Sequence, residues 1–241
     1  KPARQAQFKH IYGDIFMIRY NKQARILALD NGSIGYAIYI NDAGYLETVY
    51  FGKSLGDYSD FTCARKAGEY ATPRYSVAEG RDVGYRDGFK ADCAPLEISP
   101  HGLTDKRGAP VIIRGEDGSF ITDLRYRSHR RYKGAPEIPG LPHAHGEGCE
   151  TAQFVLEDRA LKVRAHLYIS IFADKDVIVK SFSFENYGKK RVKLARAMSM
   201  QLDLPRADYD LVHFGGRWSK ERDYNCNPVV DGVQEVSSNL G

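Results

Sequence analysis

The sequence predicts a mainly β fold, an antiparallel sandwich with long irregular loops. Residues 161–172 alternate between apolar and mixed side chains, which is the period of a strand that has one buried face. Shorter β-prone segments are separated by Gly, Asn and Asp turns about every eight to twelve residues, a spacing typical of sandwiches. No segment has a convincing amphipathic-helix pattern, and the sixteen tyrosines and eleven phenylalanines favour strands.

The first half of the chain contains four expected strands and one long loop. The strands cover residues 16–20, 25–29, 36–40 and 46–51. Asp30-Asn31-Gly32, between the second and third strands, is typical of a hairpin turn. From residue 52 to residue 92 the alternation disappears among Gly, Pro, Tyr, Asp and Arg. We expect an irregular loop there, and ordered loops of this length are usually functional.

The second half is expected to contain a long meander between shorter strands. Short strands are expected at residues 96–98 and 111–113, and residues 120–126 are expected to pair with one of them. Three prolines between residues 136 and 142 mark a second loop. The meander comprises three strands at residues 161–172, 177–184 and 192–202, with turns at 174–176 and 186–188. Two further strands are expected at residues 211–214 and 233–237.

Composition bounds the number of domains and the kinds of partner. A chain of 241 residues with 42% hydrophobic content suits one large β domain, so we expect a single domain over residues 1–241. The formal net charge is +4, from 35 basic and 31 acidic residues, and the only dense basic run covers residues 125–133. We therefore expect no nucleic-acid partner. No apolar run reaches the roughly 20 residues that span a bilayer, so we expect no membrane partner.

The four cysteines indicate a reducing compartment. Cys63, Cys93, Cys149 and Cys226 form no pair with the CxxC spacing of a zinc ribbon or redox site. Residues 1–10 are polar and contain no apolar signal segment. We therefore expect free thiols and a cytoplasmic protein.

The run from His143 to Cys149 has the residue types of a metal site. His143 and His145 could share one face of an extended segment and both bind zinc, with Glu147 and Cys149 nearby. No second cluster of ligands stands out in the sequence. We therefore expect an exposed loop, no bound metal and no other cofactor.

Residues 123–134 mix acids, bases and aromatic side chains. Such a mixture can bind sugar hydroxyls or phosphate, but it is more often a structural strip of ion pairs or a subunit contact. Ser128 and His129 are adjacent, so on a strand they face opposite ways and make a poor nucleophile and base.

Two further sites contain side chains suited to sugars. Trp218, the only tryptophan, follows two glycines, and both a stacking platform on a loop and a buried core position are compatible with it. Asp57 and Asp60 could accept hydrogen bonds from sugar hydroxyls. Glycoside hydrolysis needs two carboxylates across one bond, and the sequence alone does not pair them.

Several groups of residues, taken in order along the chain, carry a family resemblance. They include a Tyr-Phe-Gly motif at residues 50–52 and a Trp-x-x-Glu-Arg motif at residues 218–222. The full set covers residues 49–53, 60–61, 123–126, 128–130, 132–134, 139–142, 172–178, 202–205, 218–222 and 237–238. As an ordered set, it resembles the N-terminal domain of the bacterial and fungal α-galactosidases of glycoside hydrolase family 36.

This resemblance implies a fold, a reaction and the domain on which the catalytic residues lie. It implies an antiparallel β-supersandwich of the galactose-mutarotase-like type, and release of terminal α-linked galactose with retention from raffinose- or melibiose-type oligosaccharides. In this family both catalytic aspartates lie on a (β/α)₈ barrel that follows the sandwich. We expect that barrel after residue 241, as a partner of this domain, and therefore expect no catalytic residue in this chain.

The resemblance also implies where the domain meets substrate. Family members commonly form oligomers, and loops of this domain can reach an active site, so we expect a homo-oligomer that binds a galactoside oligosaccharide. The matching positions are Asp60 and Trp218, which we predict to lie near substrate. The alternatives are a carbohydrate-binding or oligomerisation module without a catalytic partner, and the same domain of an α-N-acetylgalactosaminidase or a raffinose-synthase-like transferase.

Overall fold

The chain folds into two compact units that are both built from β-strands. The computed structural model describes residues 17–61, 91–103, 105, 107–140, 144–146, 148–204 and 208–237. Unit 1 is Lys1–Asp203 and unit 2 is Leu204–Gly241. In the described ranges the only helix is a short 3₁₀ turn, η3 (Ala91–Cys93), and no helix is long and apolar enough to cross a membrane. The mainly β fold is thus confirmed.

The first sheet of unit 1 follows the chain order. Its antiparallel strands are β1 (Ile18–Asn21), β2 (Ile26–Asp30), β3 (Ile34–Ile40) and β4 (Leu46–Lys53). The predicted hairpin turn joins β2 to β3. Gly32 there has a φ of 83°, in the left-handed region that glycine adopts at no steric cost, and its N–H donates to Asp30 Oδ1 at 2.6 Å.

The second sheet contains the long alternating strand that the sequence predicts. Its antiparallel strands are β6 (Arg125–Lys133), β7 (Cys149–Asp158), β8 (Val163–Phe172) and β9 (Lys175–Asn186), in that order. In β8, alternate residues from Val163 to Ile171 are buried, as the period of two requires. Leu167 in its centre lies opposite Phe154 of β7 and Phe182 of β9.

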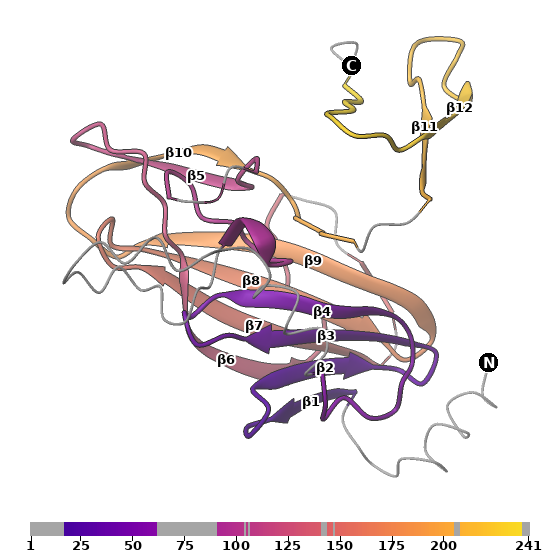
Figure 1. The fold of residues 1–241 in the computed structure, drawn as a ribbon, viewed down its shortest axis with the longest axis horizontal. Coiled ribbons are helices and arrows are strands. Elements are labelled where there is room, and N and C mark those ends of the chain that lie inside the picture. The colour runs from indigo at the N-terminus through magenta and orange to yellow at the C-terminus, as the bar shows by residue number, and fades with distance from the viewer. Residues whose placement is uncertain are drawn as a thin grey trace. The chain divides into compact units, whose positions relative to one another are not determined.

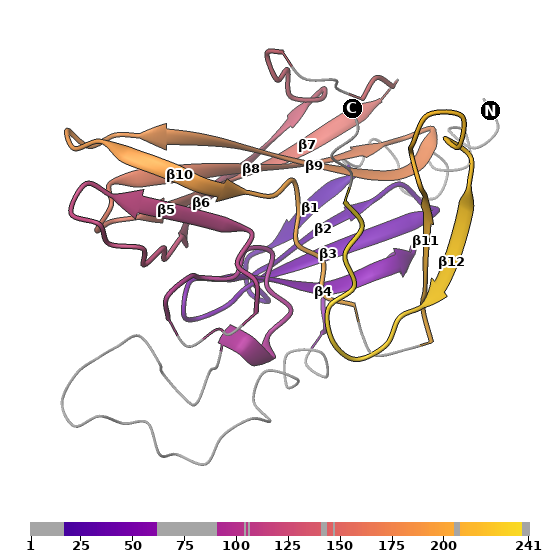
Figure 2. The ribbon, with the colours of Figure 1, turned by 90° about the horizontal axis from the view of Figure 1, so that it is seen from above.

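The main hydrophobic core lies between these two sheets, which pack face to face (Figure 1 and Figure 2). From the first sheet, Tyr36, Ile38 and Ile40 of β3 enter the core. From the second sheet, the buried face of β8 meets them. Truncating a buried aliphatic side chain of such a core to alanine costs about 2–5 kcal/mol.

The first sheet is covered on its other face as well. The remaining residues of β2 and β3 pack against two aromatic residues of the segment that follows β4, in a second cluster. This cluster comprises Ile26, Ala28, Ala37, Tyr39, Tyr58 and Phe61. Both faces of β2 are therefore buried, and the segment after β4 is held against the sheet.

Two predicted strand pairings are wrong. The strand expected third in the meander, β10 (Val192–Ala197), pairs with β5 (Val111–Gly115) in a separate sheet. It does not pair with β9, and the neighbour of β8 on its other side is β7. The alternation of β10 indicates a strand but contains no information about its partner. Residues 120–126 do not form one strand either, since Thr122 bridges His101 and β6 begins at Arg125. Leu96 makes only an isolated bridge, to Glu47.

In its described residues, unit 2 contains one antiparallel hairpin, formed by β11 (Asp210–Phe214) and β12 (Tyr224–Pro228). The strand β11 is predicted, but β12 is not, because its Asn, Cys and Pro residues are poor strand formers. The strand expected at residues 233–237 is absent. Its apolar residues Val233 and Val236 are exposed, so no neighbouring strand supports them.

A buried polar cluster joins the two sheets of unit 1. Glu97 and Lys180 form an ion pair at 2.7 Å, with side chains only 1% and 6% exposed. The Tyr36 hydroxyl donates to Glu97 Oε1, and Lys180 Nζ lies 2.6 Å from the same hydroxyl. Thr48 Oγ1 donates to Glu97 Oε1 at 2.6 Å. One carboxylate therefore links β3, β4 and β9.

Alkaline pH should destabilise unit 1 through two buried tyrosines. Burial raises the pKa of Tyr36, and the charge of Glu97 adds to this effect; burial and a hydrogen bond to Asp30 raise the pKa of Tyr58. The folded state therefore keeps both protons above pH ~10, where the unfolded chain releases them. Each tyrosine should then lower the free energy of unfolding by about 1.4 kcal/mol per pH unit.

Urea unfolding between pH 7 and pH 11 measures this loss, and Tyr58→Phe should make it less steep. A free energy of unfolding that stays constant above pH 10 would contradict the prediction.

Candidate functional site

Asp60 lies on the segment that follows β4, between two buried aromatic residues. Tyr58 and Phe61 pack into the second cluster of the first sheet, with their rings stacked at a centroid distance of 6.0 Å. The Asp60 side chain between them is exposed. The structure thus places the predicted residue on an anchored stretch of loop, with its carboxylate on the surface. Residues 62–90, the rest of the predicted long loop, lie outside the described residues.

The carboxylate of Asp57, on the same loop, serves the local turn. It accepts hydrogen bonds from the Ser59 N–H at 2.9 Å and from Ser59 Oγ at 3.0 Å. These bonds lower the pKa of Asp57, with the side-chain bond the larger cause. Asp57 therefore shapes the turn that leads to Asp60, and its two oxygens are already engaged by Ser59.

Trp218 projects from the loop that joins β11 to β12, and its side chain is 89% exposed. The sequence is compatible with either an exposed loop position or a buried core position for Trp218, and the structure shows the exposed loop position. Trp218 and Ser219 form the corner of a tight turn, in which the Lys220 N–H donates to the Arg217 carbonyl at 2.8 Å. An exposed indole offers a flat apolar surface with one N–H donor at its edge.

The spacing of the Trp-x-x-Glu-Arg motif has a local explanation in this turn. Ser219 has a φ of 61°, which is unusual for a residue with a side chain. Glu221 Oε1 accepts the Ser219 N–H at 3.0 Å. The glutamate three residues after Trp218 thus stabilises the backbone that presents the indole.

The basic run at residues 125–133 is the strand β6, at one edge of the second sheet. Arg125 donates to Asp123 and to the Ala43 carbonyl, and Arg127 donates to Glu157. Further along, Arg130 donates to Gln153 Oε1 and Arg131 to the Ile18 carbonyl. These contacts support the interpretation of residues 123–134 as a structural strip of ion pairs and hydrogen bonds.

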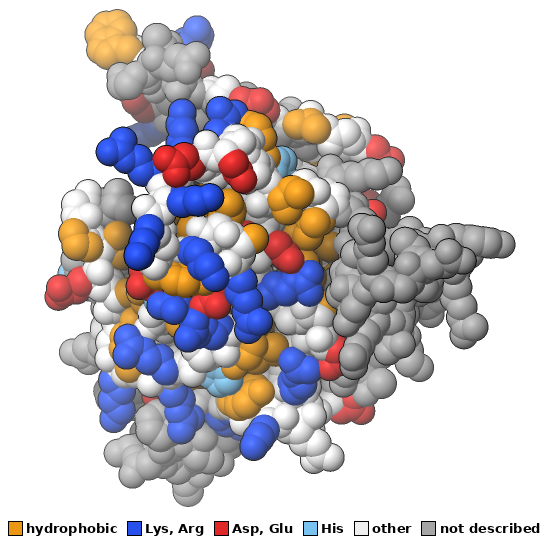
Figure 3. Space-filling view, turned by 90° about the vertical axis from the view of Figure 1, so that its left-hand side faces the viewer, with side chains coloured by type: hydrophobic (Ala, Val, Ile, Leu, Met, Phe, Trp, Pro, Cys, Tyr) orange, Lys and Arg blue, Asp and Glu red, His pale blue; other side chains and the backbone are white. Residues whose placement is uncertain are grey.

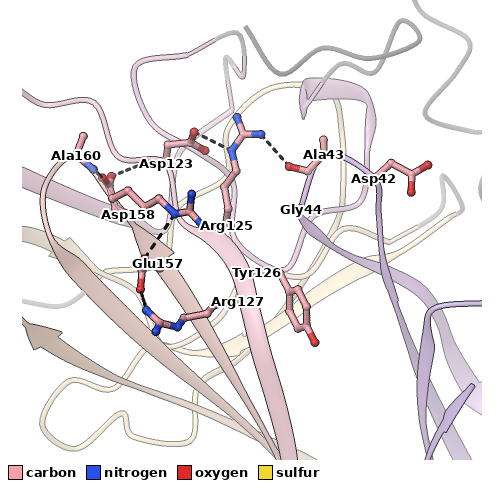
Figure 4. Close-up of a pocket in the computed structure, with 11 residues that line it drawn as sticks. Asp42, Ala43, Gly44, Asp123, Arg125, Tyr126, Arg127, Glu157, Asp158 and Ala160 are labelled. Atoms are coloured by element: carbon pink, nitrogen blue, oxygen red, sulfur yellow. Dashed lines mark hydrogen bonds and ion pairs between the residues drawn. The ribbon is translucent and has the colours of Figure 1, made fainter. Parts of the chain in front are cut away.

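A polar hollow of about 870 Å³ lies where β6 begins (Figure 4). The turn before β4 and the turn after β7 form the other walls of the hollow. Figure 4 shows Arg125 reaching across toward Asp123 and Ala43, while Arg127 points to Glu157. Arg125 and Arg127 are thus already bound to carboxylates of the hollow itself. The hollow is compatible with a small polar ligand, but its lining contains no second aromatic ring beside Tyr126.

Positive charge gathers over this end of unit 1 (Figure 3). Arg127, Arg159 and Arg164 all approach the single carboxylate of Glu157. The neighbouring turns add Lys162, Lys189, Lys190 and Arg191, whose side chains are exposed. This basic end is local, because acidic and basic residues are interspersed over the chain as a whole.

Ser128 and His129 face opposite ways, as predicted for neighbours on a strand. Ser128 is exposed, whereas the His129 ring packs against Tyr20 at a centroid distance of 4.4 Å. Burial lowers the pKa of His129. Its Nδ1 lies 2.8 Å from the Tyr126 hydroxyl. His129 is therefore part of an aromatic cluster, and it does not form a pair with Ser128.

The run from His143 to Cys149 is only partly described, since His143 and Glu147 lie outside the described residues. Within the described ranges, no group of three or more His, Cys, Asp or Glu side chains could hold a metal ion. Cys149 is buried at the start of β7, and burial raises its pKa. Cys149 and Cys226 are both free thiols, as expected.

Comparison with known proteins identifies the family of this sandwich. Residues 44–241 match the sequence model described as the glycosyl hydrolase family 36 N-terminal domain. The chain belongs to this family, which confirms the resemblance carried by the ordered motifs.

Individual relatives agree with this assignment. The α-galactosidase AgaA of Geobacillus stearothermophilus is 36% identical over 228 residues, which are 93% of this chain and 30% of the relative. The crystal structure of α-galactosidase AgaB from the same organism superposes with a TM-score of 0.80 at 34% identity, covering 92% of this chain and 30% of that one. A variant of AgaA in complex with raffinose superposes with a TM-score of 0.77 at 36% identity, covering 89% and 29%. This chain thus spans about 30% of the length of the relatives.

Proposed function

We propose that this chain is the N-terminal β-sandwich domain of a retaining α-galactosidase, which hydrolyses terminal α-linked galactose from raffinose- or melibiose-type oligosaccharides. The observation that supports this most strongly is membership of the family over residues 44–241. A solved relative at 36% identity, bound to raffinose, supports the choice of substrate.

The domain frames a reaction that takes place elsewhere in a longer protein. Its relatives are about three times as long as this chain, and we propose that the catalytic aspartates lie on a barrel that follows the sandwich. On this proposal the sandwich shapes the active site and takes part in homo-oligomer assembly. Light scattering of the longer protein would measure the assembly, and a monomer would contradict that part.

Asp60 and Trp218 are the residues that we propose to contact substrate. A carboxylate accepts hydrogen bonds from sugar hydroxyls, and hydrogen bonds to a charged group are stronger than those between neutral groups. An exposed indole stacks on the apolar face of a sugar ring, and at 89% exposure Trp218 has the surface for it. The two residues belong to different units, and each is on a short turn that its own neighbours fix.

Replacing the indole tests the proposal in the longer enzyme that contains this domain. Trp218→Ala should raise KM for raffinose about tenfold, which corresponds to ~1.4 kcal/mol of lost binding. The midpoint of urea unfolding should stay unchanged, because the side chain is exposed. Steady-state kinetics and urea titration measure the two quantities.

Val233→Ala is the matched control, since Val233 is also apolar, belongs to the same unit and is 94% exposed. Its KM should equal that of the wild type. An unchanged KM for Trp218→Ala would remove Trp218 from the substrate site. Tight binding of galactosides by the isolated 241-residue chain would favour a carbohydrate-binding module instead.

A further inference from the structure

One buried carboxylate holds the loop that carries Asp60. Asp30 ends β2 and is only 2% exposed. Its Oδ1 accepts the Gly32 N–H within the hairpin turn. Its Oδ2 faces the loop after β4 and accepts hydrogen bonds from the Tyr58 hydroxyl at 2.6 Å and from Ser54 Oγ at 2.7 Å, with the Gly56 N–H at 3.4 Å. A single oxygen thus gathers three donors of one loop.

Tyr58 is held at both ends of its side chain. The hydroxyl donates to Asp30 and also accepts the Leu55 N–H at 3.1 Å. The ring stacks on Phe61 and meets Tyr50 edge-on at a centroid distance of 6.2 Å. Arg19 adds a further bond to the loop, from Nη2 to the Gly56 carbonyl at 2.9 Å. The segment from residue 54 to residue 61 is therefore tied to the sheet by hydrogen bonds and by packing.

The hairpin turn does not explain why Asp30 is buried. The turn uses Oδ1, whereas Oδ2 serves only the loop. Burying a carboxylate is unfavourable unless hydrogen bonds replace its water, and here the loop supplies them. The hydrogen bonds of the loop thus offset the cost of burying the second oxygen of Asp30.

We propose that Asp30 and Tyr58 are positioning residues for Asp60, so that a buried carboxylate beneath this loop sets how well the enzyme binds its sugar. Asp60 lies two residues after Tyr58 and directly before Phe61, and both of these are buried. A contact with substrate must be held to within about 0.5 Å, and supporting hydrogen bonds provide this accuracy. The inference rests on the function proposed above, in which Asp60 contacts the sugar.

Removing the Tyr58 hydroxyl tests the positioning role of Asp30 and Tyr58 in the longer enzyme. Tyr58→Phe keeps the ring but loses the bonds to Asp30 and Leu55. KM for raffinose should rise about three- to tenfold, while kcat changes less than about twofold, because binding rather than chemistry is affected. Ser54→Ala, which removes another donor to the same oxygen, should raise KM in the same direction.

The control is the same substitution at a neighbouring ring. Tyr50 belongs to the same aromatic group, but its hydroxyl donates to the Lys53 carbonyl at 2.7 Å. Tyr50→Phe should therefore leave KM unchanged. A double-mutant cycle of Tyr58 and Asp60 then distinguishes an effect on KM that acts through Asp60 from one that acts through the stability of the domain. In an Asp60→Ala background, Tyr58→Phe should raise KM by less than about 1.5-fold, because the group that it positions is gone.

The outcomes distinguish this inference from the function on which it rests. If Asp60→Ala leaves KM unchanged, Asp60 does not contact substrate, and both proposals fail. If Asp60→Ala raises KM but neither Tyr58→Phe nor Ser54→Ala does, only the positioning role is overturned. If Tyr58→Phe keeps its full effect in the Asp60→Ala background, Tyr58 acts through another group, and the inference is again overturned.

Discussion

Glu97→Ala should lower the free energy of unfolding of the 241-residue chain by about 3–5 kcal/mol. The substitution leaves the ammonium of Lys180 buried without its carboxylate partner, and the Tyr36 hydroxyl loses its charged acceptor. The Coulomb attraction of a buried pair offsets the desolvation of both groups, so removing one group exposes the cost of burying the other. Because domains are stable by only about 5–15 kcal/mol, urea unfolding should show a large shift of the midpoint.

Two further variants make this prediction specific to burial. Asp42→Ala breaks the ion pair with Arg25, whose side chains are 77% and 38% exposed, and should cost less than about 1 kcal/mol. Replacing both Glu97 and Lys180 by methionine should recover most of the lost stability, because no buried charge remains. A Glu97→Ala variant as stable as Asp42→Ala would show that the pair is not buried in solution.

Gly35→Ala should lower the free energy of unfolding by about 1–3 kcal/mol. A Cβ at this position of β3 would lie 1.7 Å from the Tyr58 hydroxyl oxygen and 2.8 Å from Cζ. The tyrosine must then leave its place, and its bond to Asp30 is lost. Urea unfolding measures the loss.

Gly108→Ala is the matched control, since a Cβ there meets no atom within 4 Å. It should be neutral or slightly stabilising, because alanine lowers the conformational entropy of the unfolded chain. Equal stability of the two alanine variants would mean that Tyr58 does not pack over Gly35.

Local patterns were sufficient to predict most strands of unit 1. The alternation in β8 and the Asp30-Asn31-Gly32 turn are properties of neighbouring residues, and both are present in the structure. The ordered motifs were sufficient to predict the family. The same motifs predict that Asp60 and Trp218 lie near substrate, and these substrate contacts remain predictions.

Contacts between distant residues could not be predicted in this way. Nothing near β10 indicates that it pairs with β5, and β12 forms because β11 lies beside it. Asp30 accepts hydrogen bonds from Ser54 and Tyr58, which follow it by 24 and 28 positions in the sequence. Glu97 and Lys180 are separated by 83 positions. A single sequence contains no signal for such pairs, because each partner has the local pattern of an ordinary polar residue.

The edge strand β6 limits how copies of this protein can associate. A strand at the border of a sheet can extend that sheet by pairing with the same border of another molecule, which is a common route to uncontrolled aggregation. Five cationic side chains lie along β6, from Arg125 to Lys133, so two such borders would repel each other. Edge-to-edge pairing of β6 with the same strand of a second copy is therefore disfavoured.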